Sequence, residues 1–291
     1  MKNSTNPAGK KPPWLKKRLP TGRTYENVRR LMHENSLHTV CQEAKCPNQW
    51  ECFSNETATF LIMGPRCTRN CRFCAVDHGR MSPPDPEEPA RVAEAVKTLN
   101  LEYVVVTSVT RDDLTDGGAG HFAAVIHSIR KSRPDVRIEV LIPDFLGSKK
   151  ALDMVVAARP DVINHNLETV KRLYPTVRPE AVYKRSLSLI AYARKSAPPD
   201  MPLKSGLMLG LGETHEELIE TFQDLRQHGC SLLTLGQYLQ PSKSHLDVNR
   251  FVPPEEFEAL REDALGLGFK DVASGPFVRS SYQAKELFDR A

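Results

Sequence analysis

The residues of this chain best suited to chemistry are three closely spaced cysteines, Cys67, Cys71 and Cys74. Three and then two residues separate them, and Phe73 stands immediately before the last. Three thiolates can hold three irons of a 4Fe–4S cluster, which leaves the fourth iron for a molecule from outside the protein. This loop therefore predicts a catalytic cluster. The alternative is a zinc site completed by a residue such as His78, but zinc sites usually combine two separated ligand pairs.

A second triplet lies upstream, where four and then five residues separate Cys41, Cys46 and Cys52. The alternative here is a disulfide plus one odd thiol. The chain shows no secretory signal and no transmembrane run, which indicates a reducing cytoplasm where disulfides seldom persist. Two incomplete cysteine sets therefore predict two clusters with different roles. The seventh cysteine, Cys230, stands alone before an apolar run and is interpreted as a small buried hydrophobe.

The length, hydrophobic content and charge of the chain limit what kind of protein carries these sites. The chain has 291 residues, of which 40% are hydrophobic, enough to bury the core of one large domain or two modest ones. Its net charge of +4 is unevenly distributed, and the amino-terminal arm is basic, with Lys10, Lys11, Lys16, Lys17, Arg18, Arg23, Arg29 and Arg30. Such an arm could attract nucleic acid or an acidic protein. It lacks the repeated aromatic residues of an RNA-stacking surface, and residues 1–13 are predicted to be disordered.

Apolar runs alternate with amphipathic stretches through the rest of the chain. Strands are predicted at 59–64, 103–109, 136–142, 162–165, 203–209 and 232–238. Helices are predicted at 88–100, 120–131, 149–158, 180–196, 213–228 and 255–267. Helices that separate short buried strands indicate βαβ units and a parallel sheet. Periodicity alone leaves open whether this sheet is doubly wound or a partial barrel.

In either architecture, ligands gather at the carboxyl ends of the strands. Polar residues are found at or beyond most of the predicted strand ends, and these are Thr107, Ser108, Asp112, Asp144, Asn164, His165, Glu168, Lys204, Ser205 and Gln237. Each alone could be a helix cap or a turn residue. His165 alone indicates a hydrogen-bonded buried histidine rather than a base. The Gly-Leu-Gly-Glu turn at 210–213 is a weak nucleotide signal.

The cysteine loop at 67–74 resembles that of the radical S-adenosylmethionine (SAM) superfamily, in which the open iron binds SAM. Residues 279–282 near the end of the chain read Arg-Ser-Ser-Tyr. This motif, together with both cysteine triplets, resembles the lipoyl synthase family, which pairs CX4CX5C with CX3CX2C. The resemblance extends over residues 40–283 and includes the stretches 107–122, 164–168, 204–213 and 235–242.

The resemblance implies a partial (β/α)6 barrel of the radical SAM type, over residues 59–250. A basic, partly disordered arm (1–35) and an extension for an auxiliary cluster (36–58) precede the barrel. A carboxyl-terminal helix and the Arg-Ser-Ser-Tyr tail (251–291) follow it.

The same resemblance implies SAM and two 4Fe–4S clusters as cofactors. Cys67, Cys71 and Cys74 would hold the cluster that cleaves SAM. Cys41, Cys46 and Cys52 would hold the auxiliary cluster, with a serine of the tail as fourth ligand, and we favour Ser280 over Ser281. Expected SAM-binding residues are Thr107, Ser108, Asn164, Glu168, Arg178 and Met208. No catalytic side chain is expected beyond the cluster ligands.

The implied reaction inserts sulfur at carbons 6 and 8 of an octanoyl group carried on a protein lysine, which gives lipoyl-lysine. Unactivated C–H bonds call for radical chemistry, and the auxiliary cluster would supply the sulfur. Expected partners are octanoylated carrier domains of 2-oxo acid dehydrogenase subunits or the glycine-cleavage H protein, an electron donor and a cluster-repair protein. Neither nucleic acid nor a membrane is expected, and the expected location is the cytoplasm.

Two alternatives stand beside this reading. Another radical SAM sulfur-inserting enzyme, similar to biotin synthase or to the tRNA methylthiolating proteins, would share the loop at 67–74. It should lack the 41–52 spacing and the tail. A non-catalytic iron–sulfur sensor or carrier would not need polar residues at the strand ends, because it has no SAM to bind.

Overall fold

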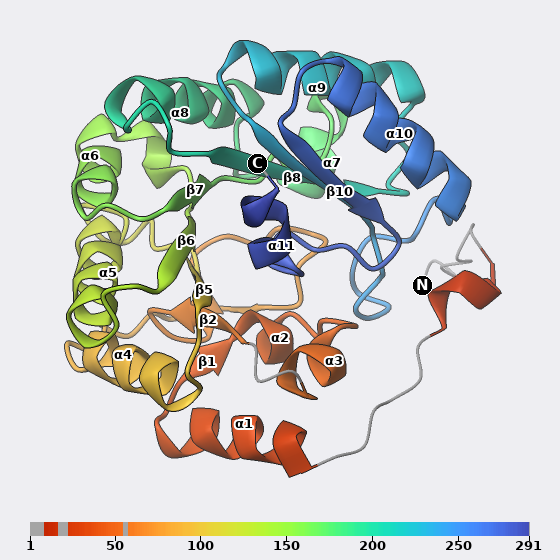
Figure 1. Ribbon diagram of the computed structural model, residues 1–291. Coiled ribbons are helices and arrows are strands. Elements are labelled where there is room, and N and C mark those ends of the chain that lie inside the picture. The colour runs from red at the N-terminus through yellow and green to blue at the C-terminus, as the bar shows by residue number, and fades with distance from the viewer. Residues whose placement is uncertain (1–8, 17–22, 55–57, 291) are drawn as a thin grey trace.

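A computed structural model describes residues 9–16, 23–54 and 58–290 of the chain. Within these residues, the main sheet has the order β1-β2-β5-β6-β7-β8-β9-β10 (Figure 1). Only its first pair is antiparallel among the described strands, and it joins β1 (His38–Thr39) to β2 (Thr59–Ile62). The strands that follow are β5 (Tyr103–Ser108), β6 (Arg137–Leu141), β7 (Val162–Asn164), β8 (Leu203–Leu209), β9 (Leu232–Gln237) and β10 (Asp271–Gly275).

From β2 onward, neighbours in the sheet are also successive parallel strands along the chain. In a doubly wound sheet the order of successive strands reverses at a switch point. The order here does not reverse from β2 to β10, so the partial barrel is confirmed. All six predicted strands are present. In the described chain a seventh parallel strand, β10, adjoins β9, and its short Asp-Val-Ala-Ser-Gly sequence has too few apolar residues to be recognised by pattern.

The predicted helices are also present, with ends within three residues of expectation. They are α4 (Glu88–Thr98), α5 (Ala119–Ser132), α6 (Lys149–Ala157), α8 (Tyr183–Ser196), α9 (His215–Gln227) and α10 (Pro254–Gly266). Their apolar faces cover the outside of the sheet (Figure 1). Helix α9 has a well-defined start, because Thr214 and Glu217 form a reciprocal capping box there.

A buried polar cluster lies between β5, β6, β7 and β8. The carboxylate of Glu139 accepts hydrogen bonds from Tyr103, Asn164 and Lys204. Lys204 Nζ lies 2.9 and 3.1 Å from the two carboxylate oxygens, and both charged side chains are about 1% exposed. Buried charges persist when they are paired and hydrogen-bonded in this way. The cluster therefore ties four neighbouring strands of the sheet together.

The amino-terminal extension packs on the barrel through α1 (Arg23–Glu34), α2 (Val40–Glu43) and α3 (Gln49–Ser54). The ring of Tyr25 stacks on Trp50 at 4.3 Å and meets Phe53 at 5.5 Å. Part of the predicted basic arm is thus a packed helix. Residues 1–8 of the stretch predicted to be disordered, and the basic residues Lys17 and Arg18, lie outside the described residues.

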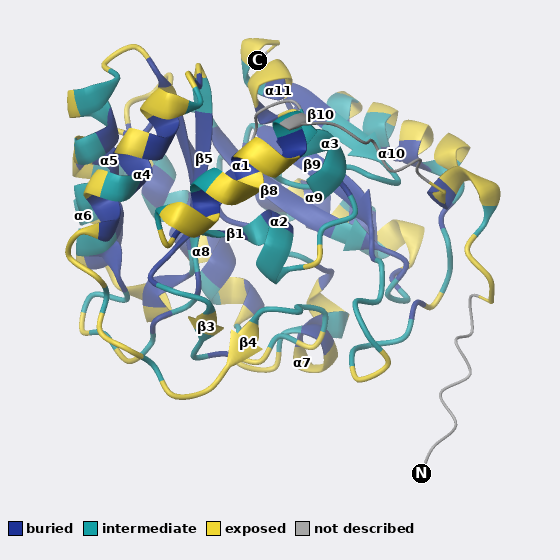
Figure 2. Cartoon of the chain, turned by 90° about the horizontal axis from the view of Figure 1, so that it is seen from below, coloured by how far each residue is buried: buried dark blue, intermediate teal, exposed yellow. Residues whose placement is uncertain are grey.

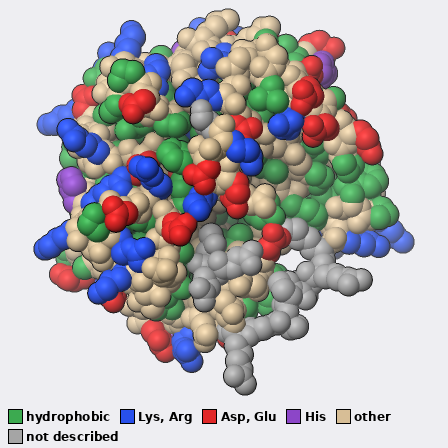
Figure 3. Space-filling view, viewed as in Figure 1, with side chains coloured by type: hydrophobic (Ala, Val, Ile, Leu, Met, Phe, Trp, Pro, Cys, Tyr) green, Lys and Arg blue, Asp and Glu red, His purple; other side chains and the backbone are tan. Residues whose placement is uncertain are grey.

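The two ends of the barrel are covered by different segments. Helix α11 (Ala284–Asp289) lies at the amino-terminal ends of the strands, where Phe288 meets Tyr103 at 5.9 Å. The short pair β3 (Arg66–Cys67) and β4 (Asp77–His78) lies at the opposite end with α7 (Tyr174–Val177) (Figure 2). On the α11 face, acidic and basic side chains are interspersed (Figure 3). No helix in the described ranges has the length and hydropathy needed to cross a membrane.

Candidate active site

The loop that bears the first cysteine triplet leaves β2 and crosses the carboxyl ends of the barrel strands. The amide and the hydroxyl of Thr68 both donate to the carbonyl oxygen of Thr110, at 3.0 and 2.9 Å. The amide of Arg72 donates to Val177 O at 3.0 Å, and Leu246 N donates to Arg72 O at 3.1 Å. Three segments that follow β5, β7 and β9 therefore hold the loop in place by its backbone.

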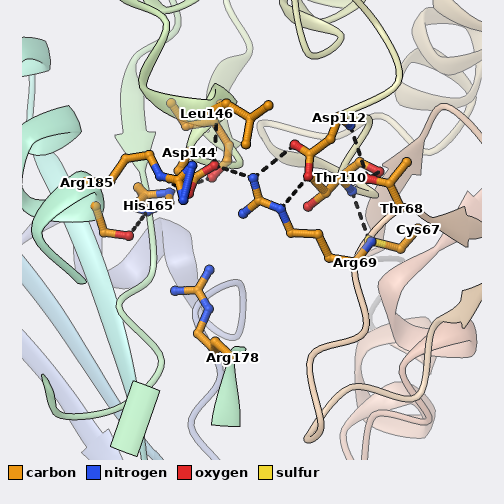
Figure 4. A network of polar contacts seen from close by, with 12 residues as sticks. Cys67, Thr68, Arg69, Thr110, Asp112, Asp144, Leu146, His165, Arg178 and Arg185 are labelled. Atoms are coloured by element: carbon orange, nitrogen blue, oxygen red, sulfur yellow. Dashed lines mark hydrogen bonds and ion pairs between the residues drawn. The ribbon is translucent and has the colours of Figure 1, made fainter. Parts of the chain in front are cut away.

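Arg69 fixes the same loop through its side chain (Figure 4). Its guanidinium is about 4% exposed and lies between two carboxylates, Asp112 beyond β5 and Asp144 beyond β6. The hydrogen bonds measure 2.6 and 2.9 Å to Asp112 and 2.6 Å to Asp144. Burial acts to raise the pKa of Asp144, but the hydrogen bond and charge of Arg69 outweigh it and lower that pKa. The sequence indicated both aspartates as strand-end residues but did not identify Arg69 as their partner.

The three thiols of the loop lie close enough for their charges to interact. The sulfur of Cys67 accepts hydrogen bonds from the amides of Thr110 at 3.2 Å and Arg69 at 3.4 Å. Hydrogen bonds of this kind tune sulfur ligands of iron–sulfur clusters. Burial raises the pKa of Cys74 to about 12 and also raises that of Cys71, so iron binding must displace protons here. The donor set and its amide hydrogen bonds fit an iron–sulfur cluster.

The second triplet gathers on the amino-terminal extension. Cys41 lies on α2, Cys52 on α3, and Cys46 in the turn between them. The thiols of Cys41 and Cys52 share a hydrogen bond, which lowers the pKa of Cys41 and raises that of Cys52. The charge of Cys46 also acts on Cys52. Three soft sulfur donors in one place again fit an iron–sulfur cluster.

The zinc alternative gains no support from the geometry. Among the described residues, no group of three or more His, Cys, Asp or Glu side chains is arranged to hold a single metal ion. His78 lies exposed on β4. The disulfide alternative for the second triplet gains none either, because all seven cysteines are free thiols.

The Arg-Ser-Ser-Tyr tail follows β10 and packs on the extension that holds the second triplet. The hydroxyl of Tyr282 donates to Glu51 Oε1 at 2.6 Å. Asn48 Nδ2 donates to the carbonyl oxygen of Phe277, also at 2.6 Å. These two contacts join residues more than two hundred positions apart in the sequence. They bring the end of the chain to the segment between Cys46 and Cys52.

The tail can pack closely against β9 because residue 236 is a glycine. The backbone of Val278 lies so close to Gly236 on β9 that a Cβ at this glycine would be 2.1 Å from Val278 O. Any other residue would push the tail away.

Burial lowers the pKa of the neighbouring Arg279, while negative charge on Cys46 and Glu168 acts against that change. Arg279 therefore lies within electrostatic reach of both the second triplet and the strand ends.

Three of the six expected SAM-binding residues lie together. Glu168 follows β7, and its backbone bridges to β8, with Met208 N donating to Glu168 O at 2.9 Å. Arg178 Nη1 donates to two carbonyl oxygens just before Glu168, those of Asn166 at 2.9 Å and Leu167 at 3.1 Å. The charges of Arg178 and Glu168 both act on Cys71. Glu168 and Arg178 therefore lie within electrostatic reach of the first triplet, and Met208 adjoins the backbone of Glu168.

The other three expected residues have partners of their own on neighbouring strands. Thr107 Oγ1 donates to Leu141 O at 2.8 Å and so links β5 to β6. Asn164 Nδ2 donates to Glu139 in the buried polar cluster. The hydroxyl of Ser108 is buried and has no hydrogen-bond partner among the described residues. A direct role of these three residues with SAM stays a prediction.

Several polar groups at the strand ends have structural roles. His165 is buried, with Nδ1 2.9 Å from Ile142 O and Nε2 2.9 Å from Ser186 Oγ, and burial lowers its pKa to about 4. It is the hydrogen-bonded buried histidine that the sequence indicated. In the turn at 210–213, the amides of Gly210 and Leu211 donate to the carboxylate of Glu213 at 2.6 and 2.9 Å. The carboxylate of Glu213 thus accepts the hydrogen bonds that these two amides would donate to a bound phosphate. The structure therefore does not support a nucleotide site in this turn.

Comparisons with known proteins agree with this geometry. Residues 61–225 match the family model of the Radical SAM superfamily, and residues 1–46 match that of the N-terminal domain of lipoyl synthase. A lipoyl synthase from Desulfotalea psychrophila is 59% identical over 97% of this chain and 94% of its own length. One from Chlorobium phaeovibrioides is 56% identical, over 94% of this chain and 96% of its own length.

The chain belongs to the lipoyl synthase family.

The fold agrees with this assignment. The solved structure of HydG, a maturase of the [FeFe]-hydrogenase, superposes with a TM-score of 0.57 at 13% identity, over 86% of this chain and 68% of that one. Members of the lipoyl synthase family are radical SAM enzymes that insert sulfur and use SAM with two 4Fe–4S clusters. The predictions of family, activity and cofactors are therefore confirmed. A non-catalytic iron–sulfur carrier and a sulfur-inserting enzyme of another family are set aside.

Proposed function

We propose that the two cysteine triplets of this chain have different roles in the reaction. Cys67, Cys71 and Cys74 hold the cluster at which SAM binds, and Cys41, Cys46 and Cys52 hold the auxiliary cluster that is the sulfur source. When bound, the clusters and SAM supply radical chemistry and sulfur that no side chain can provide. The supporting observation is that the tail packs on segment 41–52, while the charge of Glu168 acts both on Arg279 of that tail and on Cys71 of the first triplet.

The chain's own residues bind and orient the reactants in this proposal. Arg178 and Glu168, beside Cys71, offer opposite charges suited to the carboxylate and amino groups of SAM. Backbone from Met208 onward lies next to Glu168 and would face the adenine. Thr107, Ser108 and Asn164 complete the set at the neighbouring strand ends. Ser280, on the tail held by Gly236 and Tyr282, is the fourth ligand of the auxiliary cluster.

Variants of the two triplets test the division of roles. Replacing Cys67, Cys71 and Cys74 by Ala should leave one cluster per chain and abolish SAM cleavage. Replacing Cys41, Cys46 and Cys52 by Ala should spare SAM cleavage but yield no sulfur-containing product from an octanoyl-lysine substrate. Loss of SAM cleavage in the second variant, with its remaining cluster intact, would contradict the proposal.

The SAM pocket is tested separately. Glu168→Ala should weaken SAM binding at least tenfold while both clusters remain assembled, because a charged partner of the ligand is lost. The matched control is Glu94→Ala, which changes an exposed carboxylate on α4. Equal SAM affinity in both variants would remove Glu168 from the pocket.

The substrate in this proposal is an octanoyl group on the lysine of an acidic carrier domain, from a 2-oxo acid dehydrogenase subunit or the glycine-cleavage H protein. Basic residues of the amino-terminal arm, among them the exposed Lys16, would dock it. Exposed charges are screened beyond roughly 10 Å at 0.1 M ionic strength. The affinity for the carrier should therefore fall with salt, while activity on a short octanoylated peptide should change much less. Equal salt dependence would exclude docking by the arm.

The proposal also includes an electron donor for SAM cleavage and a protein that rebuilds the auxiliary cluster. If that cluster is consumed, each chain should make at most about one lipoyl group before repair, and its iron content should drop as product forms. The seven free thiols fit a reducing cytoplasm as the site of the reaction. Many turnovers without a cluster donor would contradict the consumption of the auxiliary cluster.

A further inference from the structure

One buried amide contacts both halves of the site. Asn166 lies two residues beyond β7 and is about 8% exposed. Its Nδ2 is 3.0 Å from Glu168 Oε1 and 3.2 Å from Ser280 Oγ. A carboxylate oxygen only accepts hydrogen bonds, so the amide nitrogen rather than the oxygen must face Glu168. Each N–H bond of the amide then has its own acceptor, one toward the SAM pocket and one in the tail.

The chain confines this amide on its other sides. Arg178 Nη1 donates to the backbone oxygen of Asn166 at 2.9 Å. A Cβ at Gly206 on β8 would lie 2.9 Å from Asn166 Oδ1, so the side chain packs directly against the strand. That Oδ1 is buried and has no hydrogen-bond partner among the described residues. A buried amide oxygen without a protein partner is uncommon.

The direction of the hydrogen bond suits a metal ligand. Asn166 donates to Ser280 Oγ, so the serine's own proton is not needed for this contact. A serine that binds iron through its oxygen carries negative charge there, and a donated hydrogen bond stabilises that charged form. In the described part of the chain, the neighbouring Ser281 makes no side-chain hydrogen bond of this kind. The contact therefore distinguishes two serines that the sequence alone did not.

We propose that Asn166 is a positioning residue that holds the oxygen of Ser280 for the auxiliary cluster and links it to Glu168. The inference rests on the proposed function, in which Ser280 is the fourth ligand. Asn166 itself touches neither iron nor the reacting carbon; it acts through Ser280. Because the same amide nitrogen contacts Glu168, the serine ligand and the SAM pocket share one rigid side chain.

The test measures how easily the auxiliary cluster loses one iron. Full-length protein with Cys67, Cys71 and Cys74 replaced by Ala holds only this cluster, which removes the signal of the other. Brief oxidation with ferricyanide should convert clusters with a weakened fourth ligand to the 3Fe–4S form, which is counted by its electron paramagnetic resonance signal. In this background we compare Asn166→Ala and the isosteric Asn166→Asp with Ser280→Ala as reference and Ser281→Ala as matched control.

Both Asn166 variants should give at least threefold more 3Fe–4S signal than the background protein, approaching Ser280→Ala, while Ser281→Ala should match the background. Iron and sulfide contents before oxidation establish that each variant has assembled its cluster. If Asn166→Asp fails to fold, Asn166→Ala, which only removes atoms, decides the question. Background-level signal in the Asn166 variants, with a raised signal in Ser280→Ala, would overturn the positioning role alone. Background-level signal in Ser280→Ala would overturn the ligand assignment itself and the positioning role with it.

Discussion

The guanidinium of Arg69 donates two hydrogen bonds to the carboxylate of Asp112, at 2.6 and 2.9 Å, across 43 residues of sequence. Bidentate arginine–carboxylate pairs of this kind are among the strongest hydrogen-bonded contacts in proteins. The same guanidinium reaches Asp144, which is fully buried. One arginine within the cysteine loop therefore anchors that loop to two strand ends.

We expect Arg69→Gln to destabilise the cluster-free protein by about 2 to 3 kcal/mol, because the buried Asp144 loses a charged hydrogen bond and keeps only Arg185, whose Nε lies 3.1 Å from it. The measurement is the free energy of unfolding in urea. Arg66→Gln is the matched control, since Arg66 is exposed in the same loop and should change stability by no more than about 0.5 kcal/mol. Equal effects of the two substitutions would show that Arg69 does not anchor the loop.

His165 should make stability depend on pH between about 6.5 and 4. Burial lowers the pKa of the folded form to about 4, so the unfolded chain takes up the proton first as pH falls. Stability from this group is complete above the unfolded pKa of about 6.5 and declines toward pH 4, by about 3 kcal/mol. Unfolding free energies at pH 7 and pH 4.5 measure this decline. It should shrink in His165→Asn and persist in His33→Asn, which changes an exposed histidine; persistence in both would exclude His165 as the cause.

Gly236→Ala should displace the Arg-Ser-Ser-Tyr tail, because the new Cβ would lie 2.1 Å from Val278 O. We expect product formation to fall at least tenfold while SAM cleavage is retained, and proteolytic cleavage within residues 276–283 to become faster. Gly266→Ala is the control, since nothing lies within 4 Å of a Cβ at this helical position. It should leave both activities unchanged and raise stability by up to about 1 kcal/mol. A tail that stays protected in Gly236→Ala would show that the strand yields instead.

Cys230→Ala should change neither SAM cleavage nor sulfur insertion. The thiol is fully buried, its sulfur lies 3.4 Å from Leu203 O and 3.3 Å from Leu232 O, and burial raises its pKa to about 12. A neutral buried thiol is a poor nucleophile and a poor sulfur carrier. We expect only a stability loss of about 1 kcal/mol, measured by thermal unfolding. Loss of the sulfur-containing product with both clusters intact would make Cys230 a reactant.

The sequence by itself determined the regular part of this protein. Long amphipathic periods located α4 to α6 and α8 to α10, and buried apolar runs located β2 and β5 to β9, because local pattern and burial agree in these segments. Cysteine number and spacing indicated iron–sulfur clusters, since ligand chemistry is a property of residue type. Short elements such as β10, α7 and α11 escaped prediction because four to six residues are too few to show a hydrophobic period, and they owe their structure to packing against the barrel.

Only the tertiary structure decided how the segments meet. No pattern near Asn166 indicates that its amide reaches Glu168 and Ser280, and none near Arg69 indicates two carboxylates 43 and 75 residues away. Hydrogen bonds depend on distances of tenths of an ångström and on direction, which a one-dimensional sequence does not contain. Gly236 likewise matters because of a backbone that arrives 42 residues later. Residue types select the chemistry, and long-range packing selects which residues take part in it.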